Sequence, residues 1–231
     1  MLLAKIIQAY DMSNTMSHIR HLVECLPALS LAQTNALEMV TIMYTSMQSF
    51  ISSPPDFVKL TANEQFTLLK CNLLDITMFC FVLISSDEMI NKKSAYIDLW
   101  TTIYGSDIVL QAKRINKQLL NDLTTIKLML IVLTFSSNCS IIDVHEDISN
   151  DSLFHYTHRF LQSQNVYVEL LWKYMIYRYG YYDSIPRFSR LINVSLNLIK
   201  YSAIAYRDNA IYRQLGDNII SKIKQSFVTN L

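Results

Sequence analysis

The chain has very little glycine and proline, with three glycines and four prolines among 231 residues. The tight turns of β-sandwiches and the phosphate-binding loops of many α/β enzymes depend on glycine, because it adopts backbone conformations that strain other residues. An all-helical chain needs the fewest such residues. The composition therefore predicts an all-α protein. Its length and 51% hydrophobic content are sufficient for a single domain over residues 1–231 with a large core.

Neither sign of charge dominates, since 20 Lys and Arg residues are balanced by 19 Asp and Glu residues. This balance provides no basic surface for phosphates, so we expect no direct nucleic acid binding by this chain. The four cysteines are Cys25, Cys71, Cys80 and Cys139. They form no Cys-x-x-Cys pair, which argues against zinc fingers and favours a reducing compartment.

Long hydrophobic runs are also lacking. The longest, Ile76–Ile84 and Leu128–Phe135, are much shorter than the roughly 20 residues that span a bilayer. The apolar stretch at the amino end is short and interrupted by Lys5, unlike a cleavable signal peptide. We therefore expect no membrane association.

Sequence motifs of the common enzyme classes are missing, including the Gly-x-Ser-x-Gly elbow, the P-loop and His-Glu-x-x-His. We expect neither enzymatic activity nor a cofactor. Two trios of metal-ligand types have a spacing that one helix face allows: His18, His21 and Cys25, and Asp151, His155 and His158. Neither trio has an evident fourth ligand, and such spacings are common on solvated helices. We therefore predict no metal site.

Residues 30–51 carry one apolar stripe with helical spacing. Its members are Ala36, Val40, Met43, Met47 and Phe50. The pattern predicts a long amphipathic helix with one buried face. Pro54 and Pro55 are expected to end this helix, because proline cannot donate the helical hydrogen bond.

A second helix is predicted to begin at about Thr61. Thr61 and Glu64 have the spacing of a capping box, in which a hydroxyl and a carboxylate satisfy free amide groups of the first turn. Phe66–Ile84 is apolar almost all round, with Lys70 and Asp75 as its few charges. A helix of this kind is typical of the middle of a helical stack.

One small β element is expected next. Ser94–Asp107 alternates β-branched and aromatic residues with polar ones, which predicts a hairpin or extended segment before Gly105. Leu123–Phe135 then predicts a buried helix, and Ser136–Asn150 predicts a polar loop.

The last third of the chain is expected to be helical. Asp151–Tyr179 predicts one long helix or a pair, ended by Gly180 as a C-cap. Pro186 is expected to open a further helix that reaches about Leu215. A short amphipathic segment, Ile219–Val228, follows. The helices number about ten in total.

The turn and helix around residues 54–70 carry a family resemblance. The matching residues are Pro55, Phe57 and Leu60 in the turn and Glu64, Gln65, Leu68, Leu69 and Lys70 in the helix. This run resembles the ligand-binding-domain signature of nuclear receptors. A second run, Pro186-Arg187-Phe188-Ser189-Arg190-Leu191-Ile192, resembles the opening of the family's dimerisation helix.

The resemblance implies a three-layer antiparallel helical sandwich with one small β-hairpin. It also implies a regulator of transcription in the nucleus, or one that moves there from the cytoplasm. We expect no DNA-binding domain within this chain. The protein would then be an excised domain or would act through a partner.

The resemblance also implies a groove for coactivator or corepressor peptides, clamped by charges at the two ends of a bound helix. The groove residues would be Ser52, Gln65, Lys70, Ile219, Ile220 and Lys222. Lys70 matches one family clamp, but Ser52 stands where the family has Lys. Lys222 stands where the switch helix has Glu. Corepressor binding, activity as a dimer partner and a truncated switch helix therefore stay open.

A lipophilic ligand pocket is implied as well. Its lining would be Ala36, Met39, Val40, Met43, Met47, Thr77, Met78, Phe81 and Ile84. Flexible methionine side chains suit adaptable apolar sites. The middle helix carries no Arg for a ligand carboxylate, so a ligand would be neutral and lipid-like. The alternative is that these residues are ordinary core and that bulky side chains fill the space.

The same resemblance implies a homodimer, or a heterodimer with another receptor. Arg187, Phe188, Arg190 and Leu191 would belong to the dimerisation helix, and Asp75 would pair with Arg187 or Arg190. The alternative function is a helical protein-interaction module that binds no small molecule.

Overall fold

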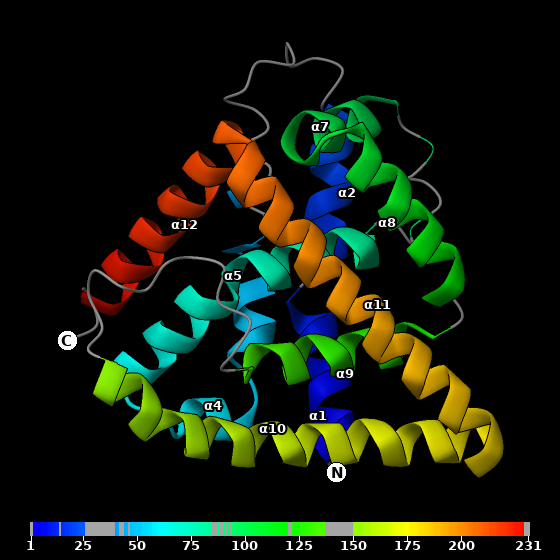
Figure 1. The fold of residues 1–231 in the computed structure, drawn as a ribbon, viewed down its shortest axis with the longest axis vertical. Coiled ribbons are helices and arrows are strands. Elements are labelled where there is room, and N and C mark those ends of the chain that lie inside the picture. Colours follow the sequence, from blue (N-terminus) through cyan, green and yellow to red (C-terminus); the bar gives the residue numbers. More distant parts are fainter. Residues whose placement is uncertain are drawn as a thin grey trace.

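The computed structural model describes residues 2–13, 15–25, 40–41, 44–45, 47–84, 87, 90, 92, 94–119, 122–136 and 150–228. The labelled helices in Figure 1 are α1 (Leu2–Met12), α2 (Thr15–Cys25), α4 (Pro55–Val58), α5 (Ala62–Ile84), α7 (Ser94–Tyr104), α8 (Ser106–Leu119), α9 (Leu123–Thr134), α10 (Asn150–Tyr179), α11 (Tyr181–Asp208) and α12 (Ala210–Val228). Residues 40–41, 44–45 and 47–51 are also helical, and no described residue lies in a strand. The protein is therefore all-α.

The helix α9 runs through the core, as predicted for Leu123–Phe135. From Thr125 to Thr134 every side chain except that of Lys127 is buried. Asp122 caps the helix, because its carboxylate accepts the amide protons of Thr124 at 3.0 Å and Thr125 at 3.3 Å. The neighbours α5, α10 and α1 cover α9 on different sides (Figure 1).

The helix α5 is the second core element and is bent. Its two parts, Ala62–Leu73 and Asp75–Val82, meet at 60°. Just before the bend, the side-chain amide of Asn72 donates to the carbonyl oxygens of Thr134 at 3.0 Å and Ser136 at 2.7 Å. These bonds join the middle of α5 to the end of α9. Among the described helices, none alone is long and apolar enough to cross a membrane; only the two parts of α5 together meet the length and composition criterion.

The hairpin predicted for Ser94–Asp107 is wrong, because this segment is α7 and the start of α8. Tyr96, Leu99, Trp100 and Ile103 are all buried. Their spacing is that of one helix face, so burial of this stripe outweighs the β propensity of the individual residues. Gly105, with φ of 88°, forms the break between the two helices.

A tight corner joins α10 to α11. Asp151–Tyr179 is part of one long helix, as one of the two predictions stated, and Gly180 follows it with φ of 81°. The prediction that Pro186 opens the next helix is wrong, because α11 begins at Tyr181. Pro186 lacks the amide that would bond the carbonyl of Tyr182, but both residues are exposed and water can satisfy that carbonyl.

The next boundary also differs from the prediction. The helix expected to reach Leu215 ends at Asp208, and Asn209 starts α12. The Asn209 carbonyl oxygen Oδ1 accepts the amide protons of Ile211 and Tyr212 at 2.9 and 3.3 Å. Its amide donates to the carbonyl oxygen of Ile103 at 2.8 Å. This side chain therefore caps α12 and ties it to α7.

Candidate functional site

The corner before α5 is built by its local sequence. Ser52 lies in a turn, and Pro54 is the N-cap of the short helix α4. Phe57 and Leu60 are buried, so the corner is anchored by its apolar residues. The prediction that the two prolines end the preceding helix and that a new helix begins near Thr61 is confirmed.

The predicted capping box is present at the start of α5. The amide of Thr61 donates to Glu64 Oε2 at 2.7 Å, and the Thr61 hydroxyl donates to the same atom at 2.9 Å. In return, the amide of Glu64 donates to Thr61 Oγ1 at 3.3 Å. The two side chains therefore satisfy backbone groups of the first turn reciprocally.

Gln65 fixes the angle between the turn and α5. Its side-chain amide donates to the carbonyl oxygens of Phe57 at 3.0 Å and Leu60 at 3.2 Å. The Phe57 carbonyl also accepts the amide proton of Leu60 at 3.1 Å, so Gln65 adds a second hydrogen bond to this turn. Gln65 is therefore a structural link, whereas the sequence placed it in a peptide groove.

The helix α10 holds the corner from outside. Arg159 Nη1 donates to both carboxylate oxygens of Glu64, at 2.9 and 3.1 Å, and Arg159 Nη2 donates to the carbonyl oxygen of Lys59 at 3.1 Å. The Tyr167 hydroxyl donates to Asp56 Oδ2 at 3.0 Å. Sequence reasoning missed Arg159 and Tyr167. The available signal was a carboxylate at the start of an apolar helix, which needs a cation once it is buried.

These contacts set the charge of Glu64, whose side chain is 3% exposed. Burial alone would raise the pKa of the Glu64 carboxyl, but the hydrogen bonds from Thr61 and the Arg159 guanidinium together lower it. The corner therefore contains a buried carboxylate that is ionised at neutral pH.

The other expected groove residues lie on α5 and α12, which pack against each other. Lys70 is half-buried, and no ion pair of Lys70 is formed within the described part of the chain. On α12, Ile219 is buried in the core, Ile220 is half-buried and Lys222 is exposed. Ile219 is therefore a packing residue, and Ile220 and Lys222 are the two expected residues of α12 that a partner can reach.

The described members of the expected ligand pocket belong to one packed core. They are Val40, Met47, Thr77, Met78, Phe81 and Ile84, and each is almost completely buried. Ala36, Met39 and Met43 lie outside the residues that the structure describes. The Thr77 hydroxyl donates to the carbonyl oxygen of Leu73 at 2.7 Å and is thus satisfied within α5.

Aromatic side chains of α7 surround Phe81. The ring centroid of Phe81 lies 4.5 Å from that of Trp100, 5.9 Å from that of Tyr104 and 6.3 Å from that of Tyr96. The Tyr104 ring in turn contacts Tyr212 of α12 at 4.8 Å. These rings occupy the space between α5, α7 and α12, as the filled-core alternative predicts.

Three buried aromatic side chains carry a polar group with no hydrogen-bond partner among the described residues. These groups are the Tyr44 hydroxyl, the Tyr104 hydroxyl and the Trp100 indole Nε1. A buried donor without an acceptor costs about 1–3 kcal/mol. The core therefore contains three hydrogen-bond donors that a small acceptor could satisfy.

Asp75 does not form the ion pair that the resemblance implied. Arg187 is exposed and stacks on the Tyr179 ring at 4.3 Å, and Arg190 is exposed on α11. Asp75 is 2% exposed, and neither carboxylate oxygen has a hydrogen-bond partner in the described structure. Burial raises the pKa of the Asp75 carboxyl to about 8. The Ser202 hydroxyl is near enough to offset this rise in part, although it is not within hydrogen-bond distance.

The residues expected in the dimerisation helix differ in how deeply they are buried. Leu191 is buried in the core and cannot lie at a subunit surface. Phe188 is half-buried and packs edge-on against Trp172 at 5.4 Å. The buried face of α11 includes Leu191, which therefore packs in the core of this chain.

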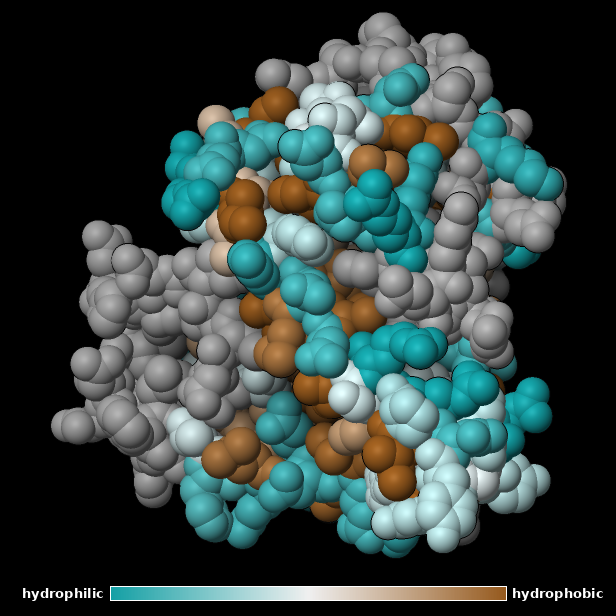
Figure 2. Space-filling model, turned by 45° about the vertical axis from the view of Figure 1, so that its right-hand side comes forward, coloured by the Kyte–Doolittle hydropathy of each residue, from teal (hydrophilic) through white to brown (hydrophobic). Residues whose placement is uncertain are grey.

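Exposed apolar side chains also lie at the α10–α11 corner, where the abundance of tyrosines in the sequence favoured interhelical packing or an interface. They form a cluster that consists of Tyr177 (88% exposed), Tyr181, Tyr182 (86% exposed) and Ile185. The lower part of Figure 2 shows hydrophobic side chains next to pale, near-neutral ones on the face in view. The run of tyrosines around Gly180 was the sequence signal for this surface.

Among the described residues, no group of three or more His, Cys, Asp and Glu side chains could hold a metal ion. The side chains of Cys25, Asp151 and His155 lie outside the described part, so neither trio considered above is complete there.

No protein-family model matches this chain, and no curated protein matches it either. The assignment of a function therefore depends on the residues and their geometry.

Proposed function

We propose that this chain is a nuclear-receptor-type regulatory domain that acts through coregulator and dimer contacts, without requiring a small-molecule ligand. The observation that carries the proposal is the corner at residues 54–70. Four residues of the matching run have a definite task there: Phe57 and Leu60 anchor the turn, Glu64 caps α5, and Gln65 joins the two. Such a corner supports the resemblance, because local sequence and local structure agree at these positions.

The packing of the helices is consistent with a three-layer sandwich. α5 and α9 contact each other in the middle, and α8 packs against α5. α10 covers α9 on one side, and α1 also contacts α9 (Figure 1). We infer that α5, α8 and α9 are the middle layer.

The proposed peptide groove lies where α12 packs on α5, with Lys70 on one element and Lys222 on the other. Lys70 would face the carbonyl end of a bound helix, where the helix dipole is negative. Lys222 would repel the amino end, because that end is positive. We therefore expect peptides with acidic residues at their amino end to bind best, since these residues offset that repulsion.

A peptide titration tests this groove. We expect Lys70→Ala to weaken binding of Leu-x-x-Leu-Leu peptides, and Lys222→Glu to strengthen binding of peptides that lack an acidic amino end. Lys173→Ala on α10 is the matched control, because Lys173 is exposed and its ion pair in the described part of the chain is with the neighbouring Glu169 at 2.6 Å. If Lys70→Ala and Lys222→Glu bound the peptides with the same affinity as the Lys173→Ala control, a groove at this position would be refuted.

The apolar cluster at the α10–α11 corner is the proposed dimer surface. Tyr and other aromatic residues are enriched in protein interfaces, and four exposed apolar side chains are grouped here. Sedimentation of the wild type and of a Tyr177→Ser/Tyr182→Ser variant measures the contribution of this surface. A wild-type dimer that the variant turns into a monomer is expected, and an unchanged dimer would place the interface elsewhere.

The second candidate is that the domain binds a small neutral lipophilic molecule. The unpartnered Tyr44 hydroxyl and Trp100 indole favour it, because a ligand carbonyl or hydroxyl would accept their hydrogen bonds. Mass spectrometry of the purified chain, native and then denatured, decides between the two. Release of a stoichiometric apolar compound supports the second candidate, and a ligand-free folded protein supports the first.

A further inference from the structure

A single carboxylate, that of Asp122, connects the start of α9 to the end of α10. It caps α9, and it also accepts hydrogen bonds from two tyrosines of α10. The Tyr174 hydroxyl donates to its two oxygens at 3.0 and 2.9 Å, and the Tyr179 hydroxyl donates to Oδ2 at 2.8 Å. The carboxylate therefore ties the last two turns of α10 to the core helix α9.

The helix α11 joins the same group of side chains through Arg187. Its guanidinium lies 4.3 Å from the centroid of the Tyr179 ring, which is a cation–π contact. Tyr179 is thus held by its hydroxyl on Asp122 and by its ring under Arg187. Burial, and next the hydrogen bond to Asp122, raise the pKa of Tyr179 to about 12, so the hydroxyl keeps its proton at neutral pH and can donate it.

These bonds divide the tyrosines of the α10–α11 corner into two sets. Tyr174 and Tyr179 are half-buried and bound to Asp122, and we call them the anchor tyrosines. Tyr177 lies between them in sequence but is 88% exposed, and Tyr182 is 86% exposed. The anchor tyrosines fix the corner, whereas the second set is presented to solvent.

A row of aromatic rings supports the exposed tyrosines. Trp172 contacts Phe188 at 5.4 Å and Tyr181 at 6.1 Å, and Tyr181 contacts Tyr182 at 5.6 Å. All three contacts are edge-to-face, which is a favoured arrangement of aromatic pairs. The exposed rings therefore rest on a packed base, and they lose little conformational freedom when a partner binds.

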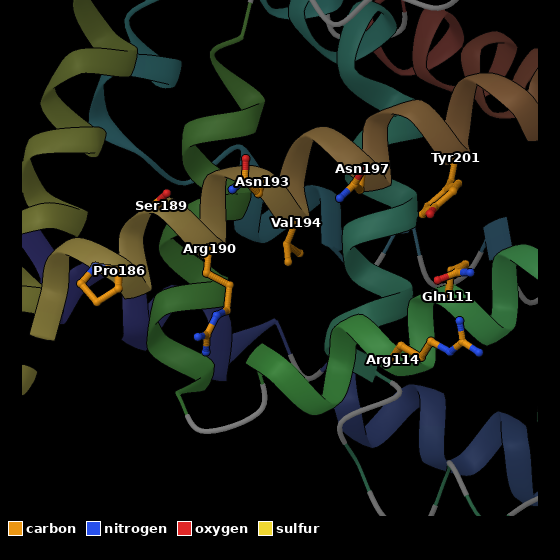
Figure 3. A pocket seen from close by; sticks show the side chains of 9 residues that line it. All are labelled: Gln111, Arg114, Pro186, Ser189, Arg190, Asn193, Val194, Asn197 and Tyr201. Carbon is orange, nitrogen blue, oxygen red and sulfur yellow. The ribbon is translucent and has the colours of Figure 1, made fainter.

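The apolar surface ends where α11 becomes polar. Figure 3 shows that part of α11, where Ser189, Asn193 and Asn197 line a groove. The α8 side of the groove is formed by Gln111 and Arg114. Polar groups of this kind favour contact with water over contact with an apolar partner. A partner of the exposed tyrosines is therefore confined to the corner itself.

We propose that Asp122 is the positioning residue of this corner, and that the rigid surface it holds takes a second copy of this chain. The inference rests on the proposed dimer surface and adds the residue that orders it. The exposed set carries no charge, so two copies of it can pack across a twofold axis as one self-complementary contact. A small contact is stable only if little freedom is lost on association, and the anchor tyrosines remove that freedom during folding.

Sedimentation of the full chain measures the dissociation constant of the dimer. Asp122→Ser keeps a hydroxyl that can cap α9 but removes the carboxylate. Tyr174→Phe/Tyr179→Phe keeps Asp122 and both rings and removes the same hydrogen bonds from the other side. We expect each of these two anchor variants to raise the dissociation constant by about tenfold, because the corner must then be ordered on association. Asp122→Asn keeps one acceptor oxygen and should have an intermediate effect.

Two controls separate a loss of stability from a loss of the surface. Thr61→Ala removes a different helix cap, at the start of α5. Asn197→Ala removes an exposed polar side chain from the same helix as part of the corner. We expect both controls to dimerise as the wild type does.

Limited proteolysis with chymotrypsin measures the order of the corner without relying on the dimer. The protease cleaves after aromatic residues and needs a locally unfolded segment. At a dilution where every variant is a monomer, cleavage between Tyr177 and Tyr182 should be about tenfold faster in the anchor variants than in the wild type. The reason is that loss of hydrogen bonds to a charged acceptor makes local opening easier.

The outcomes distinguish the two proposals. A wild type that is monomeric at every concentration would refute the dimer surface, and with it the partner named here. A dimeric wild type whose anchor variants match the controls in affinity and in cleavage would refute only the role of Asp122. Faster cleavage with an unchanged dissociation constant would also refute that role, because the surface would then not need the anchor tyrosines.

Discussion

Glu64 and Asp75 lie on the same helix, α5, and both are 2% exposed, yet their surroundings differ completely. Glu64 accepts hydrogen bonds from Thr61 and Arg159, and its pKa is lowered. Asp75 has no hydrogen-bond partner among the described residues, and its pKa is raised to about 8. Equal burial therefore gives opposite charge states at neutral pH, because the partners decide whether a buried carboxyl is ionised.

The difference follows from position along α5. Glu64 lies in the first turn, where free backbone amides are present and where Arg159 of α10 can reach it while staying half-exposed. Asp75 lies just after the bend, where α11 and α12 cover the helix. An arginine there would have to leave water entirely, which costs several kcal/mol.

The largest expected effect is a pH dependence of stability due to Asp75. The folded pKa of about 8 exceeds the ordinary value of 3.8. The folded state therefore holds this proton more tightly, and its contribution to stability is complete below pH 4 and is lost as the pH rises toward 8. The slope is at most about 1.4 kcal/mol per pH unit.

Urea unfolding of the wild type and of Asp75→Asn from pH 4 to pH 8 measures this loss. We expect the wild type to lose stability relative to Asp75→Asn as the pH rises, because Asn does not titrate. Parallel curves over the whole range would mean that Asp75 is ionised in the fold and has a partner.

Removal of Arg159 should leave Glu64 as a buried carboxylate without a neighbouring cation. We expect Arg159→Ala to lower the free energy of unfolding by about 2–3 kcal/mol at pH 7, between the cost for a fully buried pair and that for a surface pair. The loss should shrink as the pH falls through the lowered pKa of Glu64, since the protonated acid needs no cation.

The matched control is Lys173→Ala, which breaks the exposed pair with Glu169 and should cost less than about 0.5 kcal/mol. Chemical denaturation of both variants at pH 7 and pH 3 provides the comparison. A pH-independent loss for Arg159→Ala would show that its packing and its bond to Lys59 matter, and not its charge.

The hydroxyl of Thr61 provides the other half of the support for Glu64. Thr61→Ala should cost about 1 kcal/mol, as for other helix caps, because an amide of the first turn and one carboxylate lone pair lose a partner. Thr61→Ser keeps the hydroxyl and should retain most of the stability. Thermal unfolding of the Thr61→Ala and Thr61→Ser variants measures this difference. Equal melting temperatures for the two variants would contradict a role for the cap.

The capping box was predictable from sequence because its two residues are three positions apart and act through local backbone geometry. The ends of helices at Pro54 and Gly180 were predictable for the same reason. The partner Arg159 was not, because it comes from a distant helix whose placement depends on the packing of the whole core.

The errors have a physical cause as well. The β propensity of Ser94–Asp107 is a local preference, and the buried helical stripe on α7 outweighs it. An ion pair between Asp75 and α11 was expected from the resemblance, but the exposed side of α11 carries the arginines and its buried side carries Leu191 and Ser202. Charge complementarity in sequence does not determine which face of a helix points inward.

The smallest expected effect concerns the outer contact of the corner. Tyr167 donates its hydroxyl proton to Asp56, which is half-buried, and its ring stacks on Phe135 at 5.3 Å. Tyr167→Phe removes the hydrogen bond and keeps the stack, so we expect a loss of about 0.5–1 kcal/mol, measured by urea unfolding. Asp56 can then turn to water, which Glu64 cannot do when Arg159 is removed. If Tyr167→Phe lost as much stability as Arg159→Ala, access of water to the carboxylate would not explain the difference between Asp56 and Glu64. Rigidity of the corner would then decide the cost of losing either contact.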